Sequence, residues 1–175
     1  MQNFEKTYMQ MLFGIELCIK QKLQFPTLTL IYSVIDSLAY IAYGDKQVGD
    51  NFKKWVNEYM NVEKELNVTA IDLYSARNAI IHTLTPNSRD TKSKIASVIA
   101  YVWGDADLNM ANKSIEISQY KNLKFIHIND LHKSLRHGII EFLESNLSNE
   151  VNDRMNEQFS SLSKEILEDF VNFKK

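Results

Sequence analysis

Apolar residues recur at helical spacing through most of the chain. The first run covers residues 3–22 and is made of Phe4, Tyr8, Met11, Leu12, Ile15, Ile19 and Leu23. A Phe25-Pro26 step follows, and proline is well accommodated in the first turn of a helix, so a second helix is expected from there to about residue 43. Its apolar face is wide but carries Asp36 near its middle, which indicates a buried helix of a soluble protein rather than a membrane span.

Four further stretches predict helices. A third helix is expected over residues 50–60, and a fourth begins at Asn67 or Thr69, both good N-caps, and ends between residues 82 and 84 because Pro86 follows. Asn129-Asp130 predicts the N-cap of a helix that runs to about residue 145. A last helix is expected over residues 150–173.

Two short segments predict strands. Residues 95–103, IASVIAYVW, are rich in β-branched and aromatic residues and have no charge, and KFIHI at 124–128 is a second candidate. The stretch between them is either a short crossover helix or a loop with a weak strand at Ile115 and Ile117. The predicted fold class is mainly α: one domain over residues 1–175, a helical bundle with a small two-stranded β insertion.

Composition narrows the classes of protein. With 175 residues, 5 Gly and 2 Pro, the chain suits long helices better than a barrel of many short strands. A net charge of -2 excludes a strongly basic nucleic-acid coat protein but allows a local basic cleft. Residues 121–137 carry a net +3, whereas residues 141–169 hold eight acids against two bases.

The single cysteine, Cys18, excludes an internal disulfide framework and any site built from several cysteines. It is expected in the core, and its isolation fits a reducing cytosol. Charged residues such as Glu5 and Lys6 interrupt the apolar stretches near residue 1, so no signal peptide is expected and the predicted localisation is cytoplasmic.

One short motif carries candidate chemistry: Arg77, Asn78 and His82 in the sequence Arg-Asn-x-x-x-His. On a helix Asn78 and His82 share a face, whereas Arg77 and His82 lie roughly 140° apart. They converge only if the helix frays near His82 or the long arginine side chain reaches over. A histidine near neutral pH can move a proton, a guanidinium grips phosphate through two N–H groups, and an amide can orient either one. Such a set suits metal-free phosphodiester cleavage, in which a base activates a ribose 2′-OH.

The same residues also have a plain structural interpretation. Short motifs of this kind arise by composition, and a histidine after Ile80-Ile81 can simply end its helix. Arg77 would then be structural, in a salt bridge with Asp36 or Asp72.

The motif resembles that of the HEPN superfamily, whose hallmark is Arg, four to six residues and then His, often with a polar residue directly after the Arg. Arg77-Asn78-Ala79-Ile80-Ile81-His82 matches this pattern. The resemblance covers residues 3–82 and the closing helices, and the two strands are an elaboration outside it. It implies a helical bundle that dimerises with its motif helices facing each other. It further implies metal-independent endoribonuclease activity, often in toxin–antitoxin or defence systems, that leaves a 2′,3′-cyclic phosphate, with Arg77, His82 and Asn78 as the catalytic set and no cofactor.

Other residues are candidates for support. Asp36 lies in a stripe with three tyrosines, and we expect it to pair with Arg77 or orient His82 while the tyrosines line the dimer cleft; the alternative is a solvated edge. The stripe consists of Tyr32, Asp36, Tyr40 and Tyr43. Arg89 and Lys92 are candidate RNA contacts, although Arg89 is also explained as an ordinary surface arginine.

Metal chemistry is not expected. His127, His132 and His137 recur every five residues but fall on different faces, so they do not converge as zinc ligands need to. The expected partners are RNA, a second copy of the chain and an antitoxin protein, without a membrane. The alternative function is a catalytically inactive helical module that binds a protein or a nucleotide.

Overall fold

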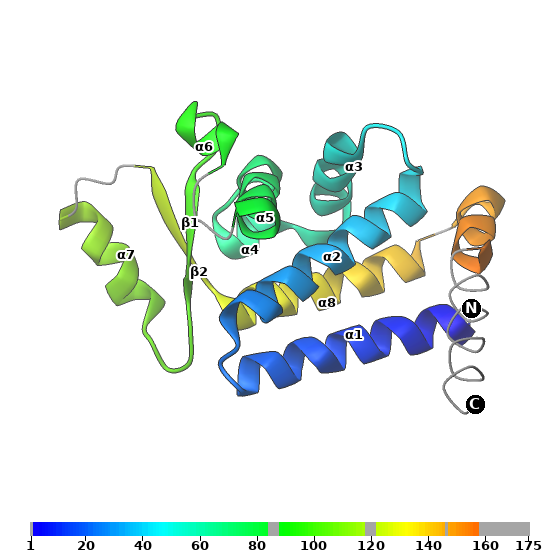
Figure 1. Cartoon of the computed structure of the whole chain (residues 1–175), viewed down its shortest axis with the longest axis horizontal. Coiled ribbons are helices and arrows are strands. Elements are labelled where there is room, and N and C mark those ends of the chain that lie inside the picture. Colours follow the sequence, from blue (N-terminus) through cyan, green and yellow to red (C-terminus); the bar gives the residue numbers. More distant parts are fainter. Residues whose placement is uncertain (1, 84–87, 118–121, 146, 158–175) are drawn as a thin grey trace, which may run out of the picture.

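A computed structural model describes residues 2–83, 88–117, 122–145 and 147–157, and it is mainly helical, as predicted (Figure 1). Helix α1 spans Gln2–Lys20 and lies alongside α2, which spans Gln24–Tyr43. Both agree with the predicted ranges. Pro26 lies in the first turn of α2, and α2 ends at Gly44, whose φ of 84° is a conformation that glycine adopts without strain.

The third predicted helix is present but changes pitch along its length. Helix α3, Val48–Trp55, continues without a break into the π-helical turn η1, Val56–Met60. A short helix α4, Val62–Leu66, was not predicted. Asn61 and Asn67 bracket α4 in the left-handed conformation, with φ of 49° and 55°, which asparagine tolerates better than most residues. These two asparagines let the chain turn sharply twice within a few residues.

Helix α5 spans Ala70–Thr83, close to the predicted bounds. Its start is the reciprocal cap between Thr69 and Asp72: the backbone N–H of Asp72 donates to Thr69 Oγ1 at 3.2 Å, and that of Thr69 donates to Asp72 Oδ2 at 3.0 Å. The short helix α6, Arg89–Lys92, was not predicted and is capped by Ser88.

The two predicted strands form a parallel pair. Strand β1 is Val98–Val102 and β2 is Leu123–His127, with Val98 opposite Leu123 and Val102 opposite His127. Parallel strands need a crossover connection, and helix α7, Leu108–Ile117, supplies it. The alternative of a weak strand at Ile115 and Ile117 is therefore wrong.

Helix α8, Ile128–Glu144, follows β2 directly. The predicted N-cap at Asn129-Asp130 is wrong by two residues. The cap is His127, whose Nδ1 accepts the backbone N–H of Asn129 at 3.2 Å, because the strand runs into the helix without a linker. Residues 149–157 are helical, as the start of the last predicted helix requires, and the rest of that prediction lies outside the described residues.

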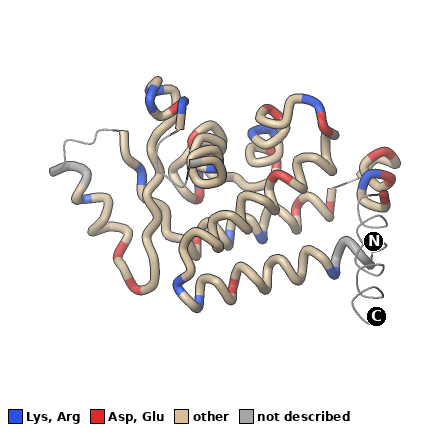
Figure 2. The backbone as a smooth tube through the Cα atoms, in the orientation of Figure 1, with Lys and Arg blue, Asp and Glu red and all other residues tan. Residues whose placement is uncertain are grey.

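Helix α2 is the centre of the core, where it contacts α1, α3, α5 and α8. Its fully buried side chains include Ile31, Val34, Ile35, Leu38 and Ile41. Within the described part of the chain α2 is also the one helix long and apolar enough to cross a membrane, but half of its apolar window is buried in the protein and it carries Asp36 as its single charge (Figure 2). These features are typical of the core helix of a soluble protein. Cys18 is half-buried, at the edge of this core rather than inside it.

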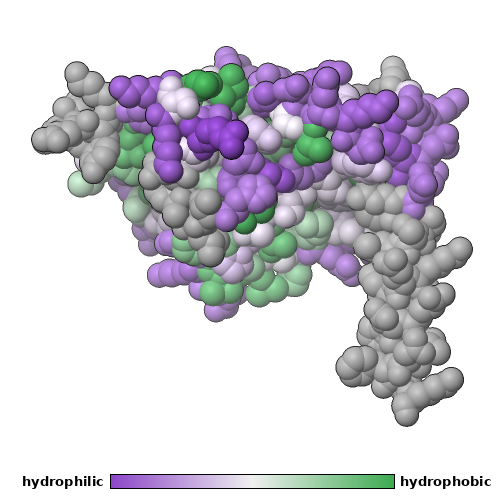
Figure 3. All heavy atoms as spheres, turned by 45° about the horizontal axis from the view of Figure 1, so that its top comes forward, coloured by the Kyte–Doolittle hydropathy of each residue, from purple (hydrophilic) through white to green (hydrophobic). Residues whose placement is uncertain are grey.

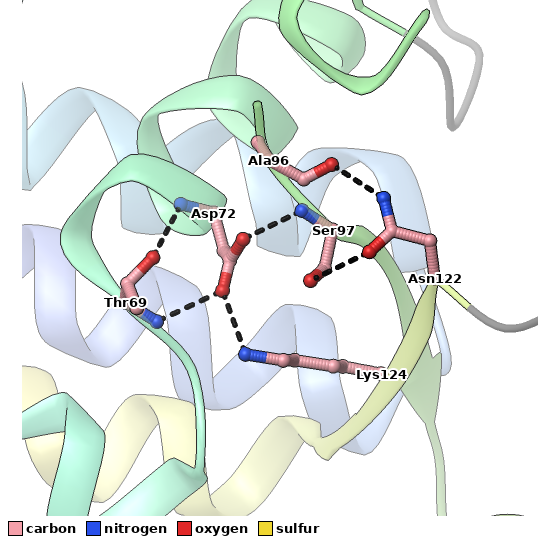
Figure 4. Close-up of polar contacts among 6 residues, drawn as sticks. All are labelled: Thr69, Asp72, Ala96, Ser97, Asn122 and Lys124. Atoms are coloured by element: carbon pink, nitrogen blue, oxygen red, sulfur yellow. Dashed lines mark hydrogen bonds and ion pairs between the residues drawn. The ribbon is translucent and has the colours of Figure 1, made fainter. Parts of the chain in front are cut away.

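A polar cluster fastens the sheet to α5 (Figure 4). Asp72 accepts the Ser97 backbone N–H through Oδ1 at 2.6 Å, and Lys124 Nζ lies 2.9 Å from Oδ2. Asn122 extends the contact by donating to the carbonyl of Ala96 at 2.9 Å. Burial raises the pKa of Asp72, but the backbone N–H groups of Thr69 and Ser97, together with Lys124, outweigh it and leave that pKa below its usual value. We call this cluster the Asp72 clasp, since it joins the start of α5 to both strands.

Candidate functional site

The motif residues converge between α2 and α5. Arg77 donates through Nε to Asp36 Oδ2 at 2.8 Å, and its Nη2 lies 2.7 Å from the same oxygen. Its Nη1 donates to Asn78 Oδ1 at 2.9 Å and lies 3.3 Å from His82 Nε2. One guanidinium therefore touches all three other residues.

Arg77 and His82 meet without any break in their helix. Helix α5 continues through His82 to Thr83, so the helix does not fray there. The side chain of Arg77 instead reaches over Asn78, which shares its face with His82, and so closes the roughly 140° gap. The expected pairing of Asp36 with Arg77 is present.

The site runs from the interior to the surface. The side chains of Arg77 and Asp36 are 16% and 20% exposed, whereas His82 is exposed. Burial raises the pKa of Asp36, and the hydrogen bond and charge of Arg77 offset part of that rise. Oδ1 of Asp36 is buried and has no hydrogen-bond partner among the described residues.

The contact between Arg77 and His82 constrains the state of the imidazole. A guanidinium has no acceptor, so Arg77 Nη1 bonds to His82 only when Nε2 carries a lone pair. A neutral imidazole with its proton on Nδ1 meets that condition. That lone pair can take a proton from an incoming hydroxyl group once the guanidinium turns away from it, for example toward a bound phosphate.

The tyrosine stripe does not form a shared surface. Tyr32 is completely buried, and its hydroxyl hydrogen-bonds to that of Tyr101 on β1. The expectation that Tyr32 lines an open cleft is wrong, because the insertion covers this part of α2. Tyr40 is exposed, and Tyr43 donates to Glu58 Oε2 at 2.6 Å.

The candidate RNA contacts lie on α6. Ser88, which caps α6, hydrogen-bonds to Ser75 of α5, so the two helices are attached to each other. Arg89 and Lys92 are exposed there. Among the hydrogen bonds between described residues, none links their side chains to Arg77, Asn78 or His82.

The three spaced histidines have separate surroundings. His127 Nε2 lies 3.0 Å from the carbonyl of Gly104, and His137 Nδ1 lies 3.7 Å from Glu65 Oε1. His132 is buried, and its Nε2 has no partner among the described residues. No group of three metal-ligating side chains comes together in the described ranges.

A cavity of about 210 Å³ lies beside β2, and no pattern in the sequence points to it. Residues of α4, α7, β2 and the start of α8 line it, with Lys124, His127 and Asp130 among its polar groups. The two nitrogens of His127 and the ammonium of Lys124 already have protein partners, and no motif residue reaches this cavity. The cavity and the motif are separate features.

No known protein family, curated protein or solved structure matches this chain at a significant level. The geometry of the Asp36–Arg77–Asn78–His82 cluster is therefore what points to a function.

Proposed function

We propose that this protein is a HEPN-like, metal-independent endoribonuclease. The observation that supports the proposal most directly is the approach of Arg77 Nη1 to both Asn78 Oδ1 and His82 Nε2, at the solvent-exposed end of the cluster. The helical bundle and the position of the motif near the end of α5 agree with the family resemblance.

In the proposed reaction His82 takes the proton of a ribose 2′-OH, and the resulting oxygen attacks the adjacent phosphorus. The P–O5′ bond breaks, which leaves a 2′,3′-cyclic phosphate on one fragment and a 5′-OH on the other. Arg77 contacts the phosphate oxygens as negative charge develops there. Asn78 accepts a hydrogen bond from Arg77 and so holds the guanidinium beside the imidazole.

Two copies are part of the proposal. A homodimer that brings two α5 helices face to face would let one His82 act as the base and the other protonate the leaving 5′ oxygen. The remaining expectations follow from the resemblance: RNA as substrate, cytoplasmic action and control by an antitoxin protein. Arg89 and Lys92 are proposed to contact RNA outside the scissile linkage.

The test is cleavage of a mixed RNA pool in the presence of EDTA. We expect the wild type to cut and to leave cyclic phosphate ends, and His82→Ala to lower the rate by about 10² to 10⁴-fold, the usual value of a proton-transfer group. His137→Ala is the matched control, because His137 is also exposed on a helix but lies outside the cluster. Equal rates for wild type and His82→Ala would refute the proposal.

Arg77 needs a subtler substitution. Arg77→Ala leaves Asp36 without its partner and can fail through stability alone. Arg77→Lys keeps a positive charge near Asp36 but cannot fork between Asp36 and Asn78. We expect Arg77→Lys to fold and to lose most cleavage.

A specific observation also favours a second candidate, a non-enzymatic binding module for a protein or a nucleotide. Arg77 is mostly buried and its ion pair with Asp36 lies within one chain, as a structural arginine would be. Under this alternative the wild type leaves every RNA intact, while Arg77→Ala still lowers the melting temperature.

A further inference from the structure

Strand β2 has an open edge. Val98 of β1 donates its backbone N–H to the carbonyl of Asn122 at 2.8 Å, which sets the phase of the ladder between the two strands. In a parallel pair, alternate residues point their backbone groups toward the neighbouring strand. The backbone groups of Leu123 and Phe125 therefore point away from β1, and within the described ranges no hydrogen bond joins them to another element.

The cavity beside β2 lies along this open edge. All five residues of the strand, Leu123–His127, line it, although successive side chains of a strand point to opposite faces. No residue of β1, a strand that the structure describes completely, lines it. A cavity with this lining lies beside β2, on the side opposite β1, rather than over one face of the sheet.

The open edge is recessed between two walls. Glu65, Leu66 and Asn67, where α4 ends, form one wall, and Leu108 and Asn112 of α7 form the other. Figure 1 shows β2 between α7 and the helical bundle. A single extended chain fits between such walls, whereas the same edge of a second copy is recessed in the same way and cannot reach this one.

The size of the cavity also limits its occupant. Pockets that enclose a drug-sized ligand or a cofactor have volumes of about 300–1,000 Å³, so this cavity of about 210 Å³ is small for a nucleotide. Glu65, Asn67, Asn112 and Asp130 are exposed, so the cavity opens to solvent. A segment that enters only in part, along the strand, suits these dimensions.

The charges of the lining favour a basic occupant. Glu65 and Asp130 contribute two carboxylates, and the one ammonium in the lining, that of Lys124, already lies 2.9 Å from Asp72. Glu65 has only the distant His137 beside it, at 3.7 Å, and no ion pair between described residues involves Asp130. The cavity therefore repels phosphate groups and attracts lysine or arginine side chains. Leu108, like the side chains of the strand, adds apolar contacts.

We propose that an extended segment of a partner protein, in which basic and apolar residues alternate, adds as a third strand to the open edge of β2. The backbone of the segment bonds to Leu123 and Phe125, and its basic side chains meet Glu65 and Asp130. The site is separate from the Arg77 cluster, and the proposal does not rest on the ribonuclease assignment. Because two strands alone have little stability, the third strand also stabilises the unit of β1, α7 and β2.

Binding of a defined peptide to the full chain tests the proposal first. The probe is the acetylated and amidated heptapeptide Thr-Val-Lys-Val-Arg-Val-Thr, measured by titration calorimetry. We expect saturable binding, and binding about tenfold weaker for the counterpart with Glu in place of Lys and Arg. No binding of the basic peptide at millimolar concentration, or equal binding of both peptides, would overturn the proposal. Free arginine that binds as tightly as the peptide would show a small-molecule site instead of an added strand.

Two substitutions at one position test the backbone contact. Phe125→Pro and Phe125→Val both remove the ring, but only proline removes the N–H that points away from β1. Proline is tolerated there because that N–H takes no part in the ladder. Phe125→Pro should bind the basic peptide about tenfold more weakly than Phe125→Val, and equal affinities would exclude an added strand. Peptide that adheres to exposed apolar surface, such as that at the lower edge of the molecule in Figure 3, would bind both variants equally.

Hydrogen exchange of the wild type needs no substitution. The amide protons of Leu123 and Phe125 should exchange more slowly once the peptide is bound, because each then has an acceptor. Unchanged exchange at saturating peptide would overturn the proposal even if Phe125→Pro failed to fold.

The carboxylates provide the last test. Glu65→Gln and Asp130→Asn should each weaken binding of the basic peptide severalfold. Glu63→Gln is the matched control, because Glu63 is also exposed on α4 but does not line the cavity. An equal loss with Glu63→Gln would mean that overall charge, and not this cavity, attracts the peptide. Self-association of the wild type that Phe125→Pro abolishes would assign the edge to a second copy and overturn the proposal.

Discussion

Arg77 places two of its nitrogens, Nε and Nη2, on one oxygen of Asp36, at 2.8 and 2.7 Å. Only Nη1 remains for the surface, where it meets Asn78 and His82. Asp36 therefore sets the direction in which the guanidinium faces outward. A half-buried carboxylate on α2 thus positions the guanidinium of α5 without itself contacting Asn78 or His82.

The first prediction concerns this pair. Asp36→Asn removes the charge but keeps the shape, so Arg77 stays in place less firmly, and we expect the free energy of unfolding to fall by about 1–3 kcal/mol. Under the proposed ribonuclease function, RNA cleavage should also fall by more than the loss of folded protein explains, because Nη1 loses its fixed direction. Chemical denaturation and cleavage rates measured below the transition check both effects. Unchanged cleavage with lowered stability would limit Asp36 to a structural role.

The Asp72 clasp carries the second prediction. Asp72→Ala removes the acceptor for two backbone N–H groups and for Lys124. It should lower the free energy of unfolding by about 2–3 kcal/mol. Lys124→Met removes only one partner of Asp72, and that partner is partly exposed. It should lower the free energy of unfolding by less, about 1 kcal/mol.

The clasp also has a pH signature. The pKa of Asp72 is lowered in the folded state, so its stabilisation is complete above the unfolded value of about 3.9 and is lost as pH falls below it. Acid titration of stability should show a shallower fall below about pH 4 for Asp72→Ala than for the wild type. An identical fall for both proteins would contradict the lowered pKa.

His132 gives a prediction nearer neutrality. Burial, with Arg136 beside it, lowers the pKa of His132, although Glu16 opposes that shift. The unfolded chain therefore takes up this proton first, and the wild type should lose stability as pH falls through about 6.5. His132→Leu should remove that part of the slope, whereas the exposed His137→Gln should keep it. Equal slopes for His132→Leu and the wild type would show that His132 stays solvated.

Two helical glycines should respond in opposite directions to alanine. A Cβ on Gly14 would meet only Leu30 Cδ1 at 3.8 Å, so Gly14→Ala should stabilise the protein by about 0.5–1 kcal/mol. A Cβ on Gly138 would meet Met60 Cγ at 2.8 Å and Trp55 at 3.0 Å, so Gly138→Ala should destabilise it by about 1–3 kcal/mol. Thermal melts of the two variants give the comparison. A gain in stability from Gly138→Ala would mean that α8 can move away from η1.

The long elements were predictable because their signal is periodic. The apolar spacing of α1, α2 and α5 and the β-branched content of β1 are local properties of the sequence, and each element lies near its predicted bounds. Helices α4 and α6 have five and four residues, too few for a period to be visible. For the segment that forms α7, the sequence allows either a crossover helix or a loop with a weak strand. The parallel pairing of the two strands requires the crossover.

The site was predictable only as far as local spacing reaches. Arg77, Asn78 and His82 share one helix, and Asp36 was suspected because a carboxylate in an apolar helix needs a partner. The burial of Tyr32 could not be foreseen, because its partner Tyr101 lies 69 residues away on a strand whose position depends on the fold. The cavity beside β2 depends on four elements and has no sequence signature.

The unit formed by β1, α7 and β2 has a thermodynamic consequence. Two strands alone have little stability in water, so this unit depends on the bundle that the Asp72 clasp attaches it to. Once the clasp opens, the unit can melt while α2 and its neighbours stay folded. Its amide protons should therefore exchange with solvent together and sooner than those of α2. The molecule would then have two levels of protection against hydrogen exchange, although it has one continuous hydrophobic core.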